Sequence, residues 1–391
     1  MVGAALAQLL ARADFSVALL ERAGLVRELP RSVHHARVSA INLGSERILT
    51  AAGAWRTIET HGVAPYIRMF VWDANSNGRI EFDSAELGVA HLGTIVENGL
   101  VVFALHKELL AAGVQVLENS EPAGVEADRD RVTLTLNSGE SVQAKVLVGA
   151  DGSGSWVRRE LGIVCESRGI DQLALSARVG TELDHRQTAW QKFLATGPLA
   201  FLPLSNGECS IVWSCERELA NDLMAMDDAE FSKELAHAFS YRLGEITSVG
   251  PRQAYALAPS LAHTYIGNRA VLVGDSAHVV HPLAGQGVNL GFADAAALVQ
   301  VLVDARAGKR NFGGKPTLRR YERWRKGDNM VMYHAFNGIE KLFHTERESV
   351  CRIRGLGLAL TDRIGPLKSA FATKAMGLSG EFPRIMSGRV D

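Results

Sequence analysis

Apolar and polar positions follow two rhythms along the chain, and together they predict alternating strands and helices. Short unbroken apolar runs, at 270–273 and in the segment that starts at Lys145, are typical of strands buried on both faces of a sheet. Apolar residues spaced three and four positions apart instead indicate amphipathic helices. We expect helices over 1–10, 97–112, 229–239, 288–307 and 317–344, and shorter ones as far as Met376.

Residues 168–265 have a different texture, because short β-rich runs replace the alternating units. Candidate strands there are 173–179, 190–193, 200–204 and 209–214. Two short strands are also expected between 66 and 83, and a small meander from 114–118, 123–127 and 132–136. We interpret 168–265 as a mostly antiparallel sheet inserted between the halves of a nucleotide-binding fold. Its aromatic residues Phe201, Trp213 and Trp190 either line a ring-binding pocket or belong to the core.

The stretch 271–291 combines a strand, a tight turn at Gly274-Asp275 and a glycine-rich loop that leads into a helix. Gly285 and Gly287 let the backbone approach a flat or charged group closely, and the helix beginning near Gly287 directs free N–H groups at the same place. Asp275 follows a strand at its carboxyl end, where open α/β sheets bind ligands. The pattern therefore predicts a ligand site; the alternative is a glycine-rich strand–loop–helix without a ligand.

Residues 1–21 have the pattern of the second half of a dinucleotide-binding unit. A helix opens with Gly3, and the strand 16–21 ends in Glu21, which is placed to bind a ribose hydroxyl. The first strand and the first two glycines of such a unit are missing from the sequence. We expect that the true start lies upstream, with a damaged chain as the alternative. Taken alone, Glu21 would be a solvated acid at a strand end.

A second glycine turn follows the strand that starts at Lys145. Asp151 lies in the turn and is expected to bond backbone there, and Arg158 lies on the helix that follows. A guanidinium in that place binds a carboxylate or phosphate. The alternative is structural, with Arg158 tying the turn to the sheet.

Composition narrows the class of protein. The chain has 391 residues, 47% of them apolar, enough for a sizeable core in one large or two ordinary domains. The net charge of −1 gives no electrostatic case for nucleic acid. The four cysteines form no Cys-x-x-Cys, which argues against a metal site and is typical of a reducing compartment. No apolar run reaches the roughly 18 residues that span a bilayer, so we expect a cytoplasmic protein.

Two segments near the C-terminus combine charge with helical spacing. One is a basic cluster that we interpret as a solvated helix face, with a partner surface or anionic lipid as the alternative; it consists of Arg319, Arg320, Arg323, Arg325 and Lys326. The other is 352–374, which mixes basic and apolar residues. We favour core packing for it over a position on a bilayer.

Three separated cofactor motifs, one of them truncated, resemble in their order those of the class A FAD-dependent monooxygenases. Within that class the chain is most similar to the ubiquinone-biosynthesis hydroxylase family. The similarity rests on Arg37-Val-Ser-Ala-Ile-Asn42, Ile95-Val-Glu-Asn98, Phe201-Leu-Pro-Leu204 and His281-Pro-Leu-Ala-Gly-Gln-Gly-Val-Asn-Leu-Gly291. Two more stretches are similar to the branch that hydroxylates 2-polyprenyl-3-methyl-6-methoxy-1,4-benzoquinol: Phe82-Asp-Ser-Ala-Glu-Leu87, and Trp190-Gln-Lys-Phe193 ahead of Gly197-Pro198.

The resemblance implies an α/β fold like that of p-hydroxybenzoate hydroxylase, with a Rossmann-like FAD-binding domain, an inserted β-rich substrate domain and a helical C-terminus. The FAD-binding domain would comprise 1–66, 95–165 and 266–345, without its first strand. The substrate domain would comprise 67–94 and 166–265, and the C-terminal helices 346–391.

The resemblance also implies a tightly bound FAD and no metal. The implied cofactor-binding residues are Gly3, Glu21, Arg37, Asn98, Asp151, Arg158, Gly274, Asp275, Pro282, Gly285, Gln286, Gly287, Val288 and Asn289. In the family, the aspartate at the place of Asp275 binds the ribityl chain. Arg37 would lie beside the pyrophosphate or be a surface charge, and Asn98 would contact the flavin or cap a helix.

No residue is singled out as a catalytic acid, base or nucleophile. The flavin-adjacent loop, Pro282, Gly285, Gly287 and Val288, lies nearest to the expected chemistry. Backbone N–H groups of Gly287 and Val288 would stabilise negative charge on reduced flavin. His278 and His281 flank the loop, and we expect them to orient it rather than transfer protons.

The implied activity is hydroxylation of an electron-rich aromatic ring with NAD(P)H and O2, through a flavin hydroperoxide. NAD(P)H would bind only transiently, and the protein would bind, orient and exclude water. The implied substrate is a polyprenylated phenol or quinol. Peripheral contact with the inner membrane, a ubiquinone-biosynthesis complex and a homodimer are further expectations. The alternatives are a reductase, a halogenase, or a non-catalytic flavin- or lipid-binding protein of the same fold.

Overall fold

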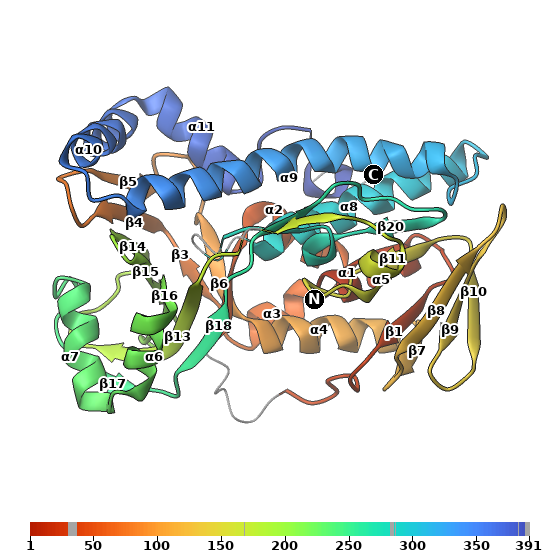
Figure 1. The fold of residues 1–391 in the computed structure, drawn as a ribbon, viewed down its shortest axis with the longest axis horizontal. Coiled ribbons are helices and arrows are strands. Elements are labelled where there is room, and N and C mark those ends of the chain that lie inside the picture. Colours follow the sequence, from red (N-terminus) through yellow and green to blue (C-terminus); the bar gives the residue numbers. More distant parts are fainter. Residues whose placement is uncertain (30–36, 168, 282–284, 286, 382, 388–391) are drawn as a thin grey trace.

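Parallel strands and long helices fill one half of the molecule (Figure 1). The computed structural model describes residues 1–29, 37–167, 169–281, 285, 287–381 and 383–387. In this half, β1 (Ala18–Glu21) is parallel to β7 (Gln115–Glu118), and β11 (Leu147–Gly149) is parallel to β20 (Ala270–Leu272). The helices α1 (Val2–Arg12), α4 (Asn98–Ala111), α5 (Trp156–Glu160) and α8 (Gly287–Ala307) surround them. Among the described strands, none joins the two parallel pairs.

Helix α8 forms the centre of this half because it is apolar around most of its circumference. It packs against α1, and its apolar residues join those of α1 and α4 in one core. By length and composition it is the single described helix that qualifies as a membrane span, yet 72% of its apolar window is buried inside the fold. Its hydrophobicity is therefore explained by the core.

The predicted meander differs from the observed one in its first strand. Residues 114–118 were expected to pair with the two strands that follow, but β7 pairs in parallel with β1. The meander consists of β8 (Pro122–Ala127), β9 (Val132–Leu136) and β10 (Ser141–Ala144). A short polar segment between two strands does not by itself tell a hairpin from a change of sheet.

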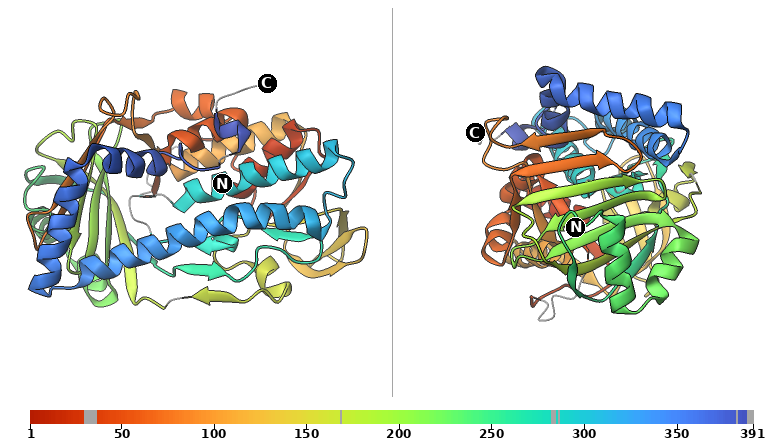
Figure 2. Two further views of the ribbon diagram at one scale, coloured as in Figure 1. Left: turned by 90° about the horizontal axis from the view of Figure 1, so that it is seen from above. Right: turned by 90° about the vertical axis from the view of Figure 1, so that its left-hand side faces the viewer.

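An eight-stranded sheet forms the other half and is seen face-on in Figure 2, right. Its strands follow the order β17-β13-β16-β15-β14-β4-β5, with β18 also paired to β13. Their bounds are β4 (Arg68–Asp73), β5 (Arg79–Asp83), β13 (Gln172–Thr181), β14 (Thr188–Leu194), β15 (Gly197–Pro203), β16 (Cys209–Glu216), β17 (Ile246–Val249) and β18 (Gln253–Ala256). All pairs are antiparallel except β14 with β4. The predicted fold class, with a mostly antiparallel insertion, is confirmed.

The two faces of this sheet are covered by different elements. Alternate residues of a strand point to opposite faces, so Phe201 and Trp213 pack on α6 (Arg217–Ala225) and α7 (Asp228–Ala238), whereas Ala200 belongs to a cluster on the opposite face. Phe201 stacks on Phe239 with ring centroids 4.0 Å apart. Phe201 and Trp213 are therefore core residues, and the alternative that they line a ring-binding pocket is wrong.

Smaller elements connect the two halves. One three-stranded sheet has the order β2 (Val38–Asn42), β6 (Gly93–Glu97), β3 (Ala64–Tyr66), and another the order β12 (Cys165–Ser167), β19 (Ser260–Ala262), β21 (His278–Val279). Helices α2 (Leu43–Ala51) and α3 (Trp55–Thr60) follow β2, and the 3-10 turn η1 (Gly274–Ser276) follows β20.

The helical C-terminus begins with one long helix that spans both halves (Figure 2, left). Helix α9 (Lys315–His344) contacts α8 with its first half, and Phe343 near its end stacks on Phe193 of β14 with centroids 4.0 Å apart. Helices α10 (Glu348–Arg363) and α11 (Gly365–Ala375) and the 3-10 turn η3 (Arg384–Ser387) complete the chain. The predicted long helix at 317–344 is confirmed.

Candidate active site

The turn after β20 is fixed by hydrogen bonds on both sides. Gly274 has a φ of +60°, a left-handed conformation that suits glycine, and its N–H donates to Asp294 Oδ2 at 3.1 Å. Ser276 Oγ donates to the carbonyl of Gly149 at 2.6 Å, which joins the ends of β11 and β20. Asp275 lies between these two bonded residues and remains exposed.

Asp275 is an acceptor without a donor among the described residues. Desolvation by the surrounding protein raises the pKa of its carboxyl, while the nearby His278 and Arg37 partly offset that effect. A carboxylate in such surroundings gains from donors that a ligand brings. Hydroxyl groups are suitable donors, so the site fits the ribityl chain of FAD.

A buried ion network centred on Asp294 of α8 supports the turn from behind. The carboxylate of Asp294 meets His278 Nε2 at 2.6 Å, Arg325 Nε at 2.8 Å and Asn329 Nδ2 at 3.1 Å. Burial alone would raise the pKa of Asp294, but His278 and Arg325 outweigh burial and lower this pKa well below its usual range. The carboxylate therefore stays ionised and accepts the N–H of Gly274.

This network corrects one interpretation of the basic cluster on α9. Arg325 is 4% exposed and is paired with Asp294, so it does not belong to a solvated face. Arg319, Arg320 and Arg323 are exposed as expected. The signal that sequence reasoning missed is Asp294 itself, because a carboxylate inside an apolar helix needs a partner when it is buried.

The loop before α8 approaches β2 closely. Gly285 has a φ of +65°, and a Cβ at this position would lie 3.3 Å from the backbone nitrogen of Ala40. Asn289 donates to the carbonyl of Ala40 at 2.8 Å and accepts from the N–H of Asn42 at 3.1 Å. Asn289 thus bonds protein backbone and fixes the first turn of α8 against β2.

The first turn of α8 has N–H groups that find no acceptor within the helix itself. Gly287 and Val288 open this 21-residue helix, and the first N–H groups of a helix have no partner within it. Together with the positive end of the helix dipole they favour a negatively charged or electron-rich group. Pro282 and Gln286, which were also predicted to lie against the flavin, fall outside the described residues.

The second glycine turn is closed by its own aspartate. Asp151 accepts from Ser155 Oγ at 2.6 Å and from the N–H of Val157 at 3.0 Å, which ties the turn to α5. Gly3 lies against the end of β11, since a Cβ there would come within 3.1 Å of the Cβ of Ala150. The start of α1 therefore packs directly on this turn.

Arg158 binds backbone on both sides of the site. Its guanidinium donates to the carbonyls of Ser276 and Ser153, each at 2.7 Å. These bonds link the turn before α5 to the turn after β20. These contacts agree with the alternative in which Arg158 ties the turn to the sheet.

Glu21, Arg37 and Asn98 come from three different elements. Glu21 ends β1 and accepts from a backbone N–H two residues later at 3.3 Å. The Arg37 guanidinium lies over the ring of Tyr255, 4.5 Å from its centroid. Asn98 accepts from Ser39 Oγ at 2.6 Å. The N-cap of α4 is the residue before Asn98, so the prediction that Asn98 caps this helix is wrong.

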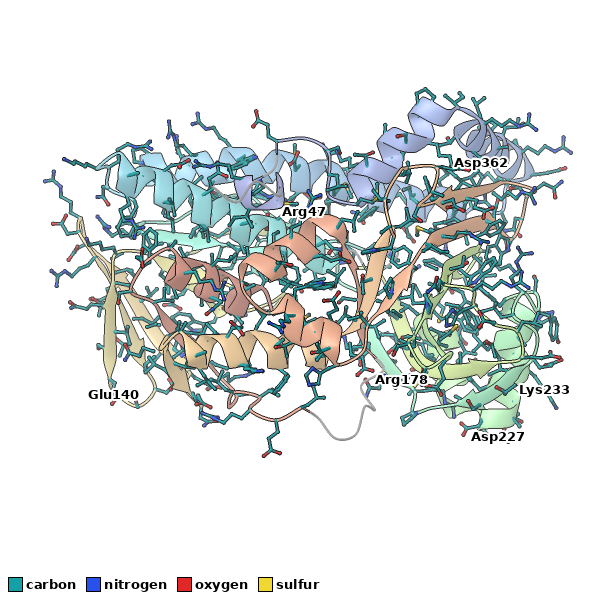
Figure 3. All side chains as sticks on the ribbon, turned by 180° about the vertical axis from the view of Figure 1, so that it is seen from behind. Arg47, Glu140, Arg178, Asp227, Lys233 and Asp362 are labelled. Carbon is teal, nitrogen blue, oxygen red and sulfur yellow. The ribbon has the colours of Figure 1, made fainter. Side chains whose placement is uncertain are left out.

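An ion pair joins the two halves beside Asn98. Arg178 of β13 pairs with Glu97 at the end of β6, and Figure 3 shows Arg178 at the junction of the halves. Burial lowers the pKa of Arg178, and the charge of Glu208 partly offsets this effect. The ion pair with Glu97 supplies a counter-charge for the guanidinium. Sequence reasoning did not identify either residue, because they are distant in the chain.

A small cavity, with room for about one water molecule, lies between Gly285 and the eight-stranded sheet. Its walls are Gln191, Pro198, Ala200, Leu202, Val212, Ser214 and Gly285. Gln191 is 4% exposed, and its Oε1 has no hydrogen-bond partner among the described residues. A buried amide oxygen without a partner is costly unless a ligand supplies a donor. Gln191 and Pro198 both belong to stretches that carried the resemblance to one branch of the family.

His281 connects the loop to the long helix. Its Nε2 lies 3.4 Å from Gln172 Oε1, and Gln172 Nε2 donates to Glu340 Oε1 at 3.3 Å. Burial lowers the pKa of His281 to about 4, so the ring is neutral at pH 7. These contacts agree with an orienting role for His281.

Comparisons with known proteins agree with this geometry. The family described as FAD binding domain matches residues 1–330. The chain is 34% identical to the ubiquinone hydroxylase UbiL of Rhodospirillum rubrum, covering 99% of this chain and 91% of that protein. It is 35% identical to the 3-demethoxyubiquinol 3-hydroxylase of Escherichia coli, covering 97% and 96%. The p-nitrophenol 4-monooxygenase PnpA of Pseudomonas putida has the same fold, with a TM-score of 0.76 at 17% identity, covering 97% of this chain and 96% of that one.

Proposed function

The chain belongs to the FAD-binding-domain family and to the ubiquinone hydroxylases within it, and from this premise we propose that its substrate is a methoxylated polyprenyl benzoquinol. The protein is an FAD-dependent hydroxylase of ubiquinone biosynthesis, and NAD(P)H is the donor typical of its class. The specific ring is the 2-polyprenyl-3-methyl-6-methoxy-1,4-benzoquinol named by the resemblance. The branch-specific stretches support this choice, since Gln191 and Pro198 line the pocket.

Asp275 is the residue that carries the cofactor assignment. Its carboxylate has no donor of its own among the described residues, and we assign it to the ribityl hydroxyls. Gly3, Glu21 and Arg37 would hold the adenosine and pyrophosphate portions. When reduced by NAD(P)H, bound FAD activates O2 for transfer of one oxygen atom to the ring. Gly287 and Val288 would stabilise negative charge on the flavin through their N–H groups.

Gln191 would orient the quinol in the pocket. Its unpaired Oε1 can accept a hydrogen bond from a ring hydroxyl, and the apolar Ala200, Leu202 and Val212 beside it would hold the ring and exclude water. This side chain would bind and orient the substrate and would take no proton from it, because an amide is not a base at neutral pH.

The wider assignments are also proposals. We propose that 1–66, 95–165 and 266–345 form the FAD-binding domain, 67–94 and 166–265 the substrate domain, and 346–391 a C-terminal helical part. We further propose a cytoplasmic location with peripheral contact at the inner membrane. A homodimer and a ubiquinone-biosynthesis complex remain predictions.

Two measurements on the full chain test the function. FAD is titrated while the absorbance bands of the flavin are followed; the expected result is stoichiometric binding that Asp275→Asn weakens.

The loaded protein is then given NADPH, O2 and short-chain quinols that differ in the position of the free ring carbon. Hydroxylation of the 6-methoxy compound alone supports the proposed ring. Turnover of another regioisomer would overturn the substrate, and bound FAD without any hydroxylated product would favour a differently specific or non-catalytic flavoprotein.

A further inference from the structure

Helices α10 and α11 present apolar side chains outward. Six such residues recur every three or four positions through the two helices and their junction, and are between 40% and 71% exposed. This outer stripe consists of Ile353, Leu356, Leu360, Ile364, Leu367 and Phe371, with Ile364 between the helices. Spacing of three and four residues places Ile353, Leu356 and Leu360 on one side of α10, and the spacing of four places Leu367 and Phe371 on one side of α11. A contiguous apolar surface of this kind indicates a site of interaction.

The inward side of the same helices carries charge. The Arg354 guanidinium is fully buried and forms two bonds of 2.8 Å to the Asp73 carboxylate. Asp362 accepts from the N–H of Glu81 at 3.2 Å and lies 3.5 Å from Lys368 Nζ; Figure 3 labels Asp362 on this helical pair. The inward side of α10 thus carries a buried ion pair beside its apolar contacts, while apolar residues also lie on its outer side.

These bonds make the outer stripe a fixed surface of the fold. Arg354 also donates to the carbonyls of Leu342, Phe343 and Thr345, which fixes the turn between α9 and α10. Gly78 in the β4–β5 turn lies so close to Gly355 that a Cβ on Gly78 would come within 2.6 Å of it. Helix α10 is therefore held tightly on the sheet, and its exposed leucines do not result from loose packing.

Basic residues flank the outer stripe. Of the six basic residues in 347–374, Arg354 is buried and Lys368 pairs with Glu86 and Asp362. Arg352, Arg363 and Lys374 are exposed. Arg352 contacts Glu348 one turn earlier, but both side chains are more than three-quarters exposed, so the pairing is weak. A second copy placed face to face would bring like charges together, whereas anionic headgroups would complement them.

The buried side of α11 contributes to an apolar cluster inside the fold. Ala372 and Met376 belong to the same apolar cluster as Ala200 and Leu202, which line the pocket beside Gly285. The C-terminal helices and the pocket walls therefore contribute to one apolar cluster, and the outer stripe lies on the exposed side of these helices.

We propose that the outer stripe of α10 and α11 is a docking surface for a bilayer that contains anionic lipid. The six apolar side chains enter the boundary between headgroups and acyl chains, and the flanking arginines and lysine bind headgroup phosphates. The docking itself is independent of the enzymatic assignment. The further step, in which a polyprenyl substrate passes from the bilayer to the pocket, rests on the proposed function.

Vesicle flotation of the FAD-loaded full chain tests the docking. Vesicles of phosphatidylcholine alone are compared with vesicles that contain one-third phosphatidylglycerol. The double variant Leu356→Glu/Leu360→Glu is expected to lower the bound fraction on anionic vesicles at least tenfold, and Arg363→Gln/Lys374→Gln about threefold. Added salt is expected to weaken binding of the parent protein. Leu183→Glu is the matched control, since Leu183 is 53% exposed but lies outside these helices, and it should bind like the parent.

The remaining outcomes are decisive. Absence of parent binding to anionic vesicles, or unchanged binding by the leucine variant, would overturn the proposal. A dimer in light scattering that the same variant dissociates would show that a second copy covers the stripe. Leu367→Ser/Phe371→Ser on α11 gives an independent variant if the first one unfolds by circular dichroism. Failure of the proposed function is recognised separately, because a short-chain quinol would then remain unmodified while vesicle binding persists.

Discussion

The two sides of the site differ at their central buried polar residues, Asp294 on one side and Gln191 on the other. On the side of the turn after β20, Asp294 is bonded to His278, Arg325 and Asn329. On the side of the eight-stranded sheet, Gln191 Oε1 and Ser176 Oγ have no partner among the described residues. A satisfied network holds one geometry, whereas unpaired groups are completed by a ligand. We therefore expect a preformed cofactor side and a substrate side that depends on its occupant.

The largest effect on stability is expected from disrupting the ion network around Asp294. Asp294→Asn removes the buried counter-charge of Arg325 and leaves it only the half-exposed Asp328. The change should lower the free energy of unfolding by about 3 kcal/mol, measured by urea denaturation of the apoprotein. FAD affinity should fall as well, because the N–H of Gly274 loses its acceptor. Asp304→Asn on the same helix is the control: Asp304 pairs with Arg384 at the surface, and the cost should stay below about 1 kcal/mol. Equal losses in the two variants would contradict the comparison.

His281, which lies between the two sides of the site, should make the free energy of unfolding depend on pH. His281 has a folded pKa of about 4 against an ordinary 6.5, so the unfolded chain binds more protons between these values. Stability is then full above pH 6.5 and is lost as pH falls toward 4, by up to about 3 kcal/mol at 1.36 kcal/mol per unit. His281→Gln should flatten this part of the curve of unfolding free energy against pH. An unchanged slope would show that other groups cause the acid sensitivity.

A separate effect on cofactor binding is expected at Asp275. Asp275→Asn should weaken FAD binding roughly tenfold to a hundredfold, the equivalent of about 1–3 kcal/mol for a lost charged hydrogen bond. The apoprotein should not lose stability. Because the folded pKa of Asp275 is raised, the carboxylate destabilises the apoprotein as pH rises through that pKa, and the asparagine removes this penalty. Calorimetric titration and apoprotein melting at pH 4 and pH 8 measure both; a variant less stable at pH 8 would contradict the assignment.

The smallest effect on the fold is expected at the unpaired side. Gln191→Leu should lower kcat/KM for the quinol by about tenfold, or roughly 1.4 kcal/mol, and leave FAD binding and stability unchanged. Phe201→Leu changes the opposite face of the same sheet and serves as control: it should cost about 1 kcal/mol or more of stability without a change in KM. A loss of stability in Gln191→Leu would show that this amide is already satisfied in the free protein.

Sequence reasoning located what depends on neighbouring residues. The strand, turn and helix around Asp275 are local, since glycines and the position after a strand determine them, and the turn at Asp151 is equally local. The order of strands in the parallel half was less accessible: 114–118 pairs with β1, nearly a hundred residues earlier in the chain. Such pairing depends on tertiary contacts that a local pattern does not record.

The polar groups that support the site were missed for a related reason. Asp294 and Arg325 are 31 positions apart, and each alone reads as an ordinary charge on a helix. The sequence also did not determine which face of the eight-stranded sheet lies toward Gly285. The alternation of residues along a strand identifies two faces, but it does not tell which one α6 and α7 cover. A shift of β15 by one residue would move Phe201 to the face of the pocket and Ala200 to the face that α6 and α7 cover.

Helix α9 contacts both sides of the site and fixes their relative position. Arg325, near one end, bonds to Asp294, and Glu340 bonds to Gln172 of the sheet. One residue inserted between Asn329 and Glu340 would rotate the far half by about 100° and turn Glu340 off the sheet. Seven inserted residues would nearly restore the rotation but would lengthen the helix by roughly 10 Å. The length of this one uninterrupted helix therefore sets the distance between the turn after β20 and the eight-stranded sheet.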